Sequence, residues 1–148
     1  MRVVINQSNY IPWKGYFDLI HDADLFIFLD DVQYTSRDWR SRNKIKTKNG
    51  LLWLTIPVGS NTNRLISQVP LPNNKWRIQH WQSIRHAYTS SPYFNYFAPI
   101  LFEAFSCSLE SGLSGFNQKL IKTISKEMLG ITKTRFLDSA SLGISGNK

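Results

Sequence analysis

Leu25-Phe26-Ile27-Phe28-Leu29 is the most informative segment for the fold, because an unbroken apolar run is typical of a strand covered on both faces of a parallel sheet. A second short apolar run, Val3 to Ile5, stands near the start of the chain. The segment between them, Asn6 to Asp24, is long enough for a helical crossover, which takes roughly a dozen residues or more. We therefore predict two adjacent parallel strands joined by a helix, a βαβ unit.

The crossover helix is expected to run from about Pro12 to His21. Proline suits the first turn of a helix, where its missing N–H costs no hydrogen bond. Trp13, Phe17 and Ile20 recur at helical spacing, so they form an apolar face that we expect to pack on the sheet.

Downstream of this unit, turn signals alternate with longer periodic segments. Asn43–Thr47 and Leu51–Pro57 flank Lys48-Asn49-Gly50, and Asn-Gly is a strong hairpin signal. Residues 59–74 are rich in Asn and predict a loop with a short strand at Leu65–Val69. The remaining elements are expected to be helices at Lys75–Tyr88, Tyr93–Ser106 and Gly115–Leu129 and a late strand at Ile131–Phe136. The sequence thus predicts a single α/β domain over residues 1–148, with a Rossmann-like parallel βαβ core, a β-hairpin and C-terminal helices.

The amino-acid composition indicates a folded protein without disulfides or a membrane-spanning segment. With 148 residues and 42% hydrophobic residues, the chain can bury a real core. Its single cysteine, Cys107, cannot form an internal disulfide, which suits a reducing compartment. The chain has no apolar run long enough to span a membrane, and Val3–Ile5 is too short for a secretory signal. We expect a cytoplasmic protein.

The charge is strongly basic and unevenly spread. The chain carries 18 Lys and Arg against 10 Asp and Glu, and no acidic residue occurs from Trp39 to Phe102. Such a surplus draws anions, including phosphates, nucleotides and nucleic acid. The five Trp residues add stacking surfaces with a polar edge, which favours a ligand surface.

Polar residues follow both predicted strands at the point where each strand ends. In a parallel sheet these ends meet at one edge, and ligands bind outside it. The crossover helix points its N-terminus at the same edge, which favours an anion, and Gly15 would allow a close approach. The residues concerned are Gln7, Ser8, Asn9 and Tyr10 after the first strand and Asp30, Asp31, Gln33 and Tyr34 after the second.

Each of these residues also has an ordinary structural role open to it. Asp30 and Asp31 could cap the next turn, and Gln7 could satisfy backbone groups of its own loop. Their joint placement at one sheet edge is what favours a binding site.

A basic run extends from Arg37 to Lys48 with Asp38 as its only acid. Arginine grips phosphate or carboxylate with two parallel hydrogen bonds, and Trp39 could stack on a base or a sugar. We interpret Arg37, Arg40 and Arg42 as functional. Lys44, Lys46 and Lys48 alternate along a predicted strand and are expected on a solvated face.

Other motifs argue against several classes of enzyme. His80 and His86 lie beside two Trp residues on a predicted helix, where a histidine is more often a packed core residue than a catalyst. The chain has no HExxH spacing, so no zinc site is expected, and it lacks GxSxG, Walker A and GxGxxG motifs.

The motifs at the strand ends and in the basic run resemble those of the WbqC-like family of bacterial proteins. A helix with Trp76, His80 and Tyr88 and the following Ser91-Pro92-Tyr93-Phe94 extend the likeness to most of the chain. The matching segments are Gln7-Ser8-Asn9-Tyr10-Ile11-Pro12-Trp13-Lys14-Gly15-Tyr16-Phe17, Phe28-Leu29-Asp30-Asp31-Val32-Gln33-Tyr34, Arg40-Ser41-Arg42-Asn43 and Trp53-Leu54-Thr55-Ile56-Pro57-Val58.

The resemblance implies a cytoplasmic role in making or modifying activated sugars, since members are often encoded among genes for O-antigen and other surface polysaccharides. Members are usually longer than this chain. We therefore expect an incomplete member whose sheet leaves an unpaired edge or an exposed apolar patch, with no finished element in the tail Leu137–Lys148.

The leading hypothesis is a transferase-type enzyme of surface polysaccharide biosynthesis that acts on a small anionic substrate, a nucleotide sugar or an activated acyl donor. Asp30 or Asp31 would bind a hydroxyl, an amine or Mg²⁺, while Arg40 and Arg42 would neutralise developing negative charge. The expected substrate-binding residues are Gln7, Tyr10, Trp13, Gly15, Gln33, Tyr34, Arg37 and Asn43. Alternatives are a nucleic-acid-binding module and a non-catalytic scaffold of a polysaccharide-synthesis complex.

We expect one electropositive cleft to unite the main members of this set. They are Gln7, Tyr10, Asp30, Asp31, Gln33, Arg40 and Arg42.

Overall fold

A three-stranded parallel sheet forms one side of the computed structural model, which describes residues 1–106 and 111–143. Its strands are β1 (Val3–Asn6), β2 (Leu25–Phe28) and β5 (Arg135–Asp138), in the order β1-β2-β5. Val3 pairs with Leu25 in a parallel register, and helix α1 (Lys14–Asp22) connects the two strands. The predicted βαβ unit is confirmed, although its helix begins two residues later than expected.

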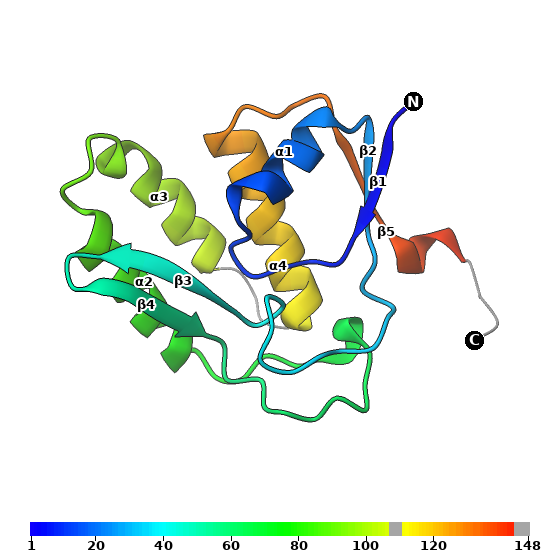
Figure 1. The fold of residues 1–148 in the computed structure, drawn as a ribbon, viewed down its shortest axis with the longest axis horizontal. Helices are drawn as coiled ribbons and strands as arrows, with labels where there is room; N and C mark the ends of the chain where they lie inside the picture. The colour runs from blue at the N-terminus through cyan, green and yellow to red at the C-terminus, as the bar shows by residue number, and fades with distance from the viewer. Residues whose placement is uncertain (107–110, 144–148) are drawn as a thin grey trace.

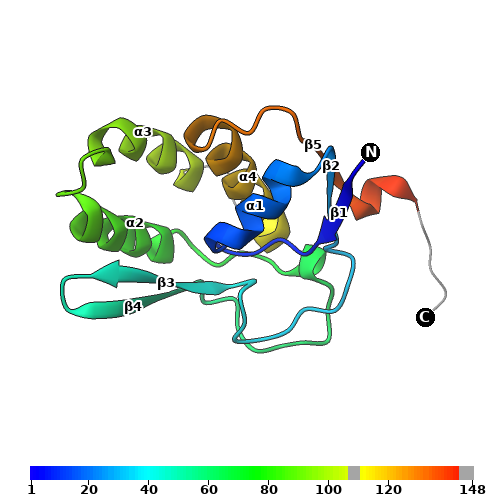
Figure 2. The ribbon, with the colours of Figure 1, turned by 45° about the horizontal axis from the view of Figure 1, so that its top comes forward.

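Helices cover one face of this sheet. Figures 1 and 2 show α1 and α4 (Gly112–Thr123) side by side against it. Phe26 and Phe28 of β2 point to this side and are fully buried with Tyr16 and Ile20 of α1. Phe136 of β5 stacks on Phe28 with ring centroids 5.7 Å apart. An aromatic layer therefore holds the sheet to the two helices.

The opposite face of the sheet is more open. Val3, Ile5 and Leu137 remain 43%, 58% and 38% exposed, whereas Ile27 between them is buried. Because Phe26 and Phe28 are buried on one face and Ile27 on the other, the expectation that β2 is covered on both faces is confirmed, although α1 and α4 lie on the same side. The expected exposed apolar patch is present here, and β1 and β5 are both edge strands.

The second sheet is the predicted hairpin, formed by β3 (Arg42–Thr47) and β4 (Gly50–Thr55). Ile45 and Leu54 point inward and are buried, while Lys44 and Lys46 are exposed. The predicted solvated lysine face is therefore confirmed for these two residues.

Helices α2 (Lys75–Tyr88) and α3 (Phe94–Phe105) complete the second half and confirm two predicted helices. Helix α4 confirms the third, and it continues into a π-helical turn at Ile124–Met128. The buried side of α2 consists of Trp76, His80 and Ile84, so the interpretation of His80 as a packed residue is correct. No described helix has both the length and the apolar character needed to cross a membrane.

Two short elements differ from the sequence-based expectation. Residues 66–68 form a 3₁₀ helix rather than a strand, and only Leu65 makes a single bridge, to Gln33. The last strand begins at Arg135 rather than Ile131. Its start is fixed from outside, because the Thr134 hydroxyl donates to two backbone carbonyl groups at the end of α1, 2.7 and 3.0 Å away.

The architecture is thus mixed α/β, with a parallel sheet, an antiparallel hairpin and helices between them. Strand β5 carries Leu137 and Asp138 of the expected tail, and a 3₁₀ turn follows at Ser139–Leu142. The expectation of an unfinished tail is wrong for these residues, while residues 144–148 lie outside the described ones.

Candidate functional site

The carboxyl ends of the three parallel strands meet around Asp30, as the sequence predicted for the first two. Asp30 is fully buried, and one of its oxygens accepts the backbone N–H of Ser8 at 2.8 Å. The other oxygen accepts the Ser114 hydroxyl and the Gln118 amide of α4. The Gln118 amide also donates to Asp138 at the end of β5, 2.8 Å away. One buried carboxylate therefore ties two strand ends to a helix.

These contacts define what the two predicted acids do in the folded chain. Both oxygens of Asp30 already accept hydrogen bonds from the protein, which suits a positioning role. Asp31 is half-buried and accepts the Ser139 hydroxyl at 2.6 Å. Over residues 1–106 and 111–143, no three His, Cys, Asp or Glu side chains group in a way that could hold a metal ion.

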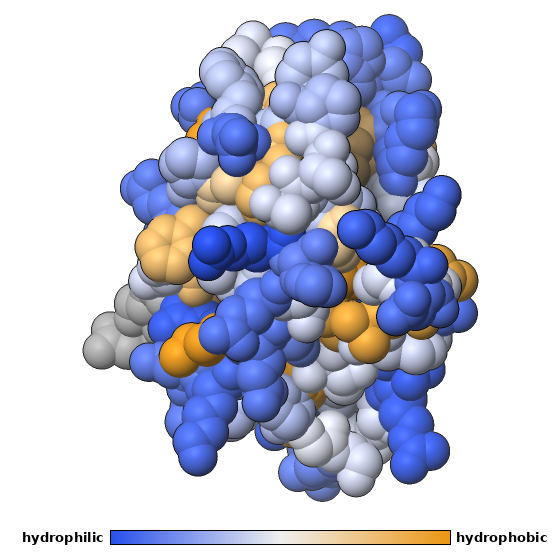
Figure 3. All heavy atoms as spheres, turned by 90° about the vertical axis from the view of Figure 1, so that its left-hand side faces the viewer, coloured by the Kyte–Doolittle hydropathy of each residue, from blue (hydrophilic) through white to orange (hydrophobic). Residues whose placement is uncertain are grey.

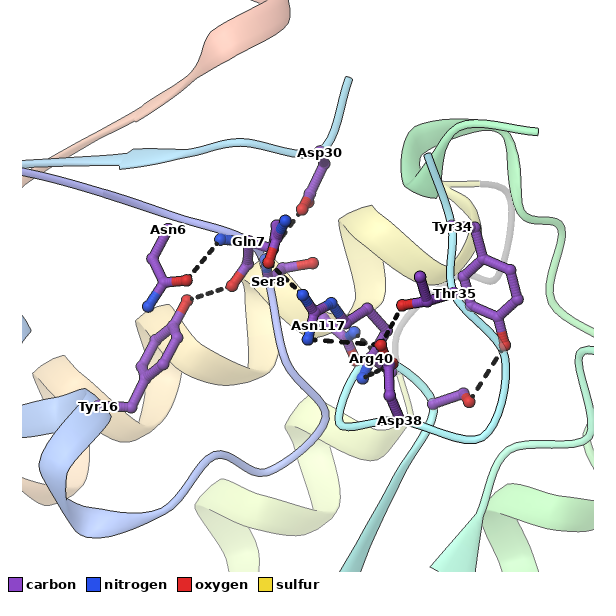
Figure 4. A network of polar contacts seen from close by, with 11 residues as sticks. Asn6, Gln7, Ser8, Tyr16, Asp30, Tyr34, Thr35, Asp38, Arg40 and Asn117 are labelled. Atoms are coloured by element: carbon purple, nitrogen blue, oxygen red, sulfur yellow. Dashed lines mark hydrogen bonds and ion pairs between the residues drawn. The ribbon is translucent and has the colours of Figure 1, made fainter. Parts of the chain in front are cut away.

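Arg40 reaches the same edge from the loop that precedes the hairpin (Figure 4). Its guanidinium donates to the Gln7 side-chain oxygen, and another of its nitrogens lies 3.6 Å from the Asp38 carboxylate. The Asn117 amide of α4 donates to the Arg40 backbone carbonyl at 2.8 Å. The Arg40 side chain is only 17% exposed, so it is a largely buried cation. Contacts with Gln7, Asp38 and Asn117 hold this residue in place.

Four buried polar atoms in this neighbourhood have no hydrogen-bond partner: Ser8 Oγ, Asn9 Oδ1, Arg40 Nε and Asn117 Oδ1. We call Gln7, Ser8, Asn9, Arg40 and Asn117 the Arg40 cluster. A buried polar atom without a partner costs about 1–3 kcal/mol, so several in one place indicate a site built to receive water or a ligand.

Tyr16 closes the inner side of the cluster. Its hydroxyl donates to the Gln7 backbone carbonyl at 2.8 Å. Burial, and next the negative charge of Asp30, raise the Tyr16 pKa far above its ordinary value, while Arg40 acts in the opposite direction. Tyr16 is therefore a neutral donor that fixes the loop after β1.

Tyr10 points away from this cluster into the core between the helices. Its side chain is fully buried, and its hydroxyl lies 2.8 Å from Nδ1 of His80. Only its backbone serves the site, because the Tyr10 N–H donates to the Trp39 carbonyl at 2.8 Å and so keeps the two loops together.

Arg42 lies on the outer face of the hairpin rather than beside Arg40. Its guanidinium carbon is 4.4 Å from the centre of the Trp53 ring, and the Lys44 ammonium is 4.6 Å from the same ring. The Trp39 ring lies next to it, with centroids 6.2 Å apart. Both Trp rings are more than two-fifths exposed.

The other predicted site residues are dispersed. Gln33 is exposed and donates to the Thr62 carbonyl at 3.3 Å, and Tyr34 is fully buried with its hydroxyl 3.2 Å from Ser41. Asn43 donates to the Ile11 carbonyl, while Arg37 is exposed.

Trp13 and Gly15 form a local pair at the start of α1. Trp13 is half exposed, and a Cβ on Gly15 would lie only 2.8 Å from its indole nitrogen. The group that closely approaches Gly15 is therefore the Trp13 side chain.

The structure therefore unites Gln7, Asp30 and Arg40 and leaves Tyr10, Gln33 and Arg42 elsewhere. Sequence reasoning missed Asn117, Gln118 and Ser114. Their helical spacing with apolar Ile121 was the available signal, since polar residues in a buried stripe have to find partners.

Comparison with known proteins gives one relative and one family. The chain is 41% identical over 144 residues to the uncharacterized protein Rv1507c of Mycobacterium tuberculosis, and the match covers 93% of this chain. The chain spans 60% of the length of that relative. No solved structure matches. The model of the WbqC-like protein family matches residues 7–148, a range that includes every member of the Arg40 cluster. The chain belongs to the WbqC-like protein family.

Proposed function

We propose that this protein is a transferase-type component of bacterial surface polysaccharide biosynthesis that binds an anionic, activated substrate at the Arg40 cluster. One observation carries the proposal. Of the seven buried side-chain atoms without a partner in the described part of the chain, four belong to this cluster, and the cluster lies at the carboxyl edge of a parallel sheet. That edge is where parallel sheets bind their ligands.

The donor or acceptor character of the four unpartnered atoms indicates which substrate groups the cluster can bind. Arg40 Nε is a donor and suits a phosphate or carboxylate oxygen. The side-chain oxygens of Asn9 and Asn117 are acceptors and suit hydroxyl groups, and the Ser8 hydroxyl can serve either way. An anionic group next to hydroxyl groups is what a nucleotide sugar offers, so we favour this class over an acyl donor.

Asp38 is the partner of Arg40 that an anionic substrate would replace. In the free protein it faces Arg40 at 3.6 Å and also accepts the Arg40 backbone N–H at 3.0 Å. A substrate phosphate that pairs with Arg40 in two-point fashion replaces the looser contact with Asp38. Arg40 then neutralises charge on the leaving group, and Asp31, half-buried at the same edge, offers a carboxylate for a hydroxyl or Mg²⁺.

Binding measured by calorimetry tests the proposal. A panel of nucleotide sugars and acyl donors is titrated into the wild type, Arg40→Ala, Arg40→Lys and Lys46→Ala. We expect one nucleotide sugar to bind, with Arg40→Ala weakening its affinity by about 1.5–3 kcal/mol because one charge-assisted bond is lost. Lys46→Ala is the matched control, since Lys46 lies on the solvated hairpin face.

The outcome separates the alternatives. Equal small losses in Arg40→Ala and Lys46→Ala would mean that a diffuse basic field binds the ligand and that the Arg40 cluster is not the site. Absence of binding across the panel would favour a non-catalytic scaffold. Mass spectrometry of the incubated mixtures then identifies any transferred group.

A nucleic-acid-binding module is the second candidate, and one observation favours it. Trp39, Arg42 and Lys44 gather around the exposed Trp53 ring on a hairpin without acidic residues. Stacking rings with interspersed cations suit single strands. Binding to random oligonucleotides whose affinity falls steeply with salt, and which Trp53→Ala abolishes while Arg40→Ala does not, would support this function instead.

A further inference from the structure

The side of the hairpin that points away from the core is not covered by another described element. Figure 2 shows α2 on one side of β3 and β4 and no further helix or strand of the described residues on the other. The buried Ile45 and Leu54 belong to the inner side, and strand side chains alternate between the two sides. Cross-strand partners share a side, so the outer side carries three pairs: Arg42 with Thr55, Lys44 with Trp53 and Lys46 with Leu51. We call these six residues, together with Trp39 beside Trp53, the outer hairpin face.

One stripe of this face is apolar. Leu51 is 69% exposed, and the rings of Trp39 and Trp53 continue the stripe away from the turn. Figure 3 looks onto the end of the molecule where the hairpin turns, and it shows apolar side chains in orange among polar ones in blue. Exposed apolar side chains that gather in one place, with polar ones around them, are typical of an interaction surface.

The neighbouring stripe is basic. The guanidinium of Arg42 and the ammonium of Lys44 lie 4.4 and 4.6 Å from the centre of the Trp53 ring, and Lys46 is exposed across from Leu51. No acidic residue occurs between positions 39 and 102, and the nearest acid before them, Asp38, faces Arg40. The positive charge of this stripe is therefore available to an anionic partner.

We propose that the outer hairpin face binds the surface of an anionic lipid bilayer. Trp side chains favour the boundary between lipid headgroups and acyl chains, and lysine and arginine near an anionic membrane are attracted to its surface. Their long stems can lie along apolar groups while the charges meet lipid phosphates. Leu51 favours a bilayer over a nucleic acid, because an aliphatic side chain gains from burial among lipids and has no partner on a phosphate backbone. The proposal does not rest on the function proposed for the Arg40 cluster.

Co-sedimentation of the protein with lipid vesicles tests the basic stripe. We expect binding to vesicles of phosphatidylcholine and phosphatidylglycerol in equal amounts, and little binding to vesicles of phosphatidylcholine alone. Lys46→Ala should lower the partition coefficient for the anionic vesicles by roughly fivefold, the usual contribution of one lysine near such a surface. Lys119→Ala is the matched control, because it removes the same charge from an exposed position on α4 and should leave binding unchanged.

The apolar stripe is tested with a second pair of variants. Leu51→Asp should weaken binding to the anionic vesicles at least about tenfold, since an apolar contact is lost and a repelling charge is gained. Leu19→Asp is its control, because Leu19 is an exposed leucine on α1. Bromine-labelled lipids should quench the tryptophan fluorescence of the wild type, and Trp53→Phe should reduce that quenching.

Four outcomes would overturn the proposal. The first two are equal binding to neutral and anionic vesicles and an absence of quenching by the labelled lipids. The others are equal losses within either pair of variants, and binding of random oligonucleotides without binding of vesicles, which would assign the face to nucleic acid. Arg40→Ala should bind vesicles like the wild type, because the Arg40 guanidinium is directed to Gln7. Failure of this proposal and failure of the proposed function are therefore distinguishable.

Discussion

Asp30 accepts the backbone N–H of Ser8 at 2.8 Å across 22 positions of sequence, and this contact joins the end of β2 to the loop that follows β1. The same carboxylate holds Gln118 of α4 at 3.1 Å. Ser8 is thereby fixed in the Arg40 cluster, and the Gln7 side chain beside it meets the guanidinium of Arg40. The position of the cluster therefore depends on a buried carboxylate that lies behind it.

Replacing Asp30 by Ala should destabilise the fold by about 2–4 kcal/mol, because three donors lose their acceptor in a buried place. Asp30→Asn should cost less, since its side-chain oxygen can still accept from Ser8. Urea unfolding followed by circular dichroism measures both. Asp18→Ala serves as the control and should have little effect, because Asp18 pairs with Lys14 on an exposed helix face. Equal losses at the two positions would contradict the role given to Asp30.

His80 should make the protein sensitive to acid. Burial lowers the pKa of His80 to about 4, with a hydrogen bond to the Thr55 backbone acting in the opposite direction. The folded pKa is below the unfolded value of about 6.5, so the unfolded chain takes up the proton first. The contribution to stability is complete above pH 6.5 and is lost as the pH falls toward about 4, by up to about 3 kcal/mol.

The physical cause is burial, because the charged imidazolium would lose its hydration in the core. The Tyr10 hydroxyl, 2.8 Å from Nδ1, can donate to that nitrogen only while it is unprotonated, and it would have to turn and accept after protonation. Urea unfolding at several pH values between 7.5 and 4.5 measures the effect. His80→Gln removes the titrating group and should flatten the curve over this window. A variant that loses stability in acid as steeply as the wild type would assign the effect to other groups.

Gly112 and Gly130 form a matched pair for testing backbone packing. Both have a φ of 65°, which a side chain disfavours by roughly 1–2 kcal/mol. A Cβ on Gly112 would also lie 2.8 Å from the Val69 carbonyl oxygen, whereas a Cβ on Gly130 meets open space. Gly112→Ala should therefore destabilise the fold by at least about 1 kcal/mol more than Gly130→Ala. Thermal unfolding compares the two, and equal shifts in Tm would exclude a clash.

Arg37 is exposed and has a φ of 58°. Because glycine adopts this conformation without a steric cost, Arg37→Gly should raise the free energy of unfolding by about 0.5–1 kcal/mol. Arg37→Ala keeps the unfavourable conformation and should not stabilise, which makes it the control in the same urea titration. A ligand affinity that falls in both variants would give Arg37 a part in binding that its position alone does not reveal.

Local sequence was sufficient for most of the fold. The apolar run in β2, the helical spacing of Phe17 and Ile20, and the Asn49-Gly50 turn each act over a few residues, so the parallel pair, its helix and the hairpin were predictable. The start of β5 was not predictable, because a hydrogen bond from Thr134 to the end of α1 fixes it across more than a hundred residues.

For the candidate site, local sequence was enough to predict that polar residues would follow β1 and β2 and meet at one sheet edge, since the period of a strand and the direction of a crossover are local properties. Which of these residues contact one another depends on how distant segments pack. The Tyr10 hydroxyl contacts His80 and the Arg42 guanidinium lies over Trp53, while Asn117 reaches the site from α4, far along the chain. These contacts could not be predicted because each buried polar group must find a partner, and those partners exist only once distant segments have packed together.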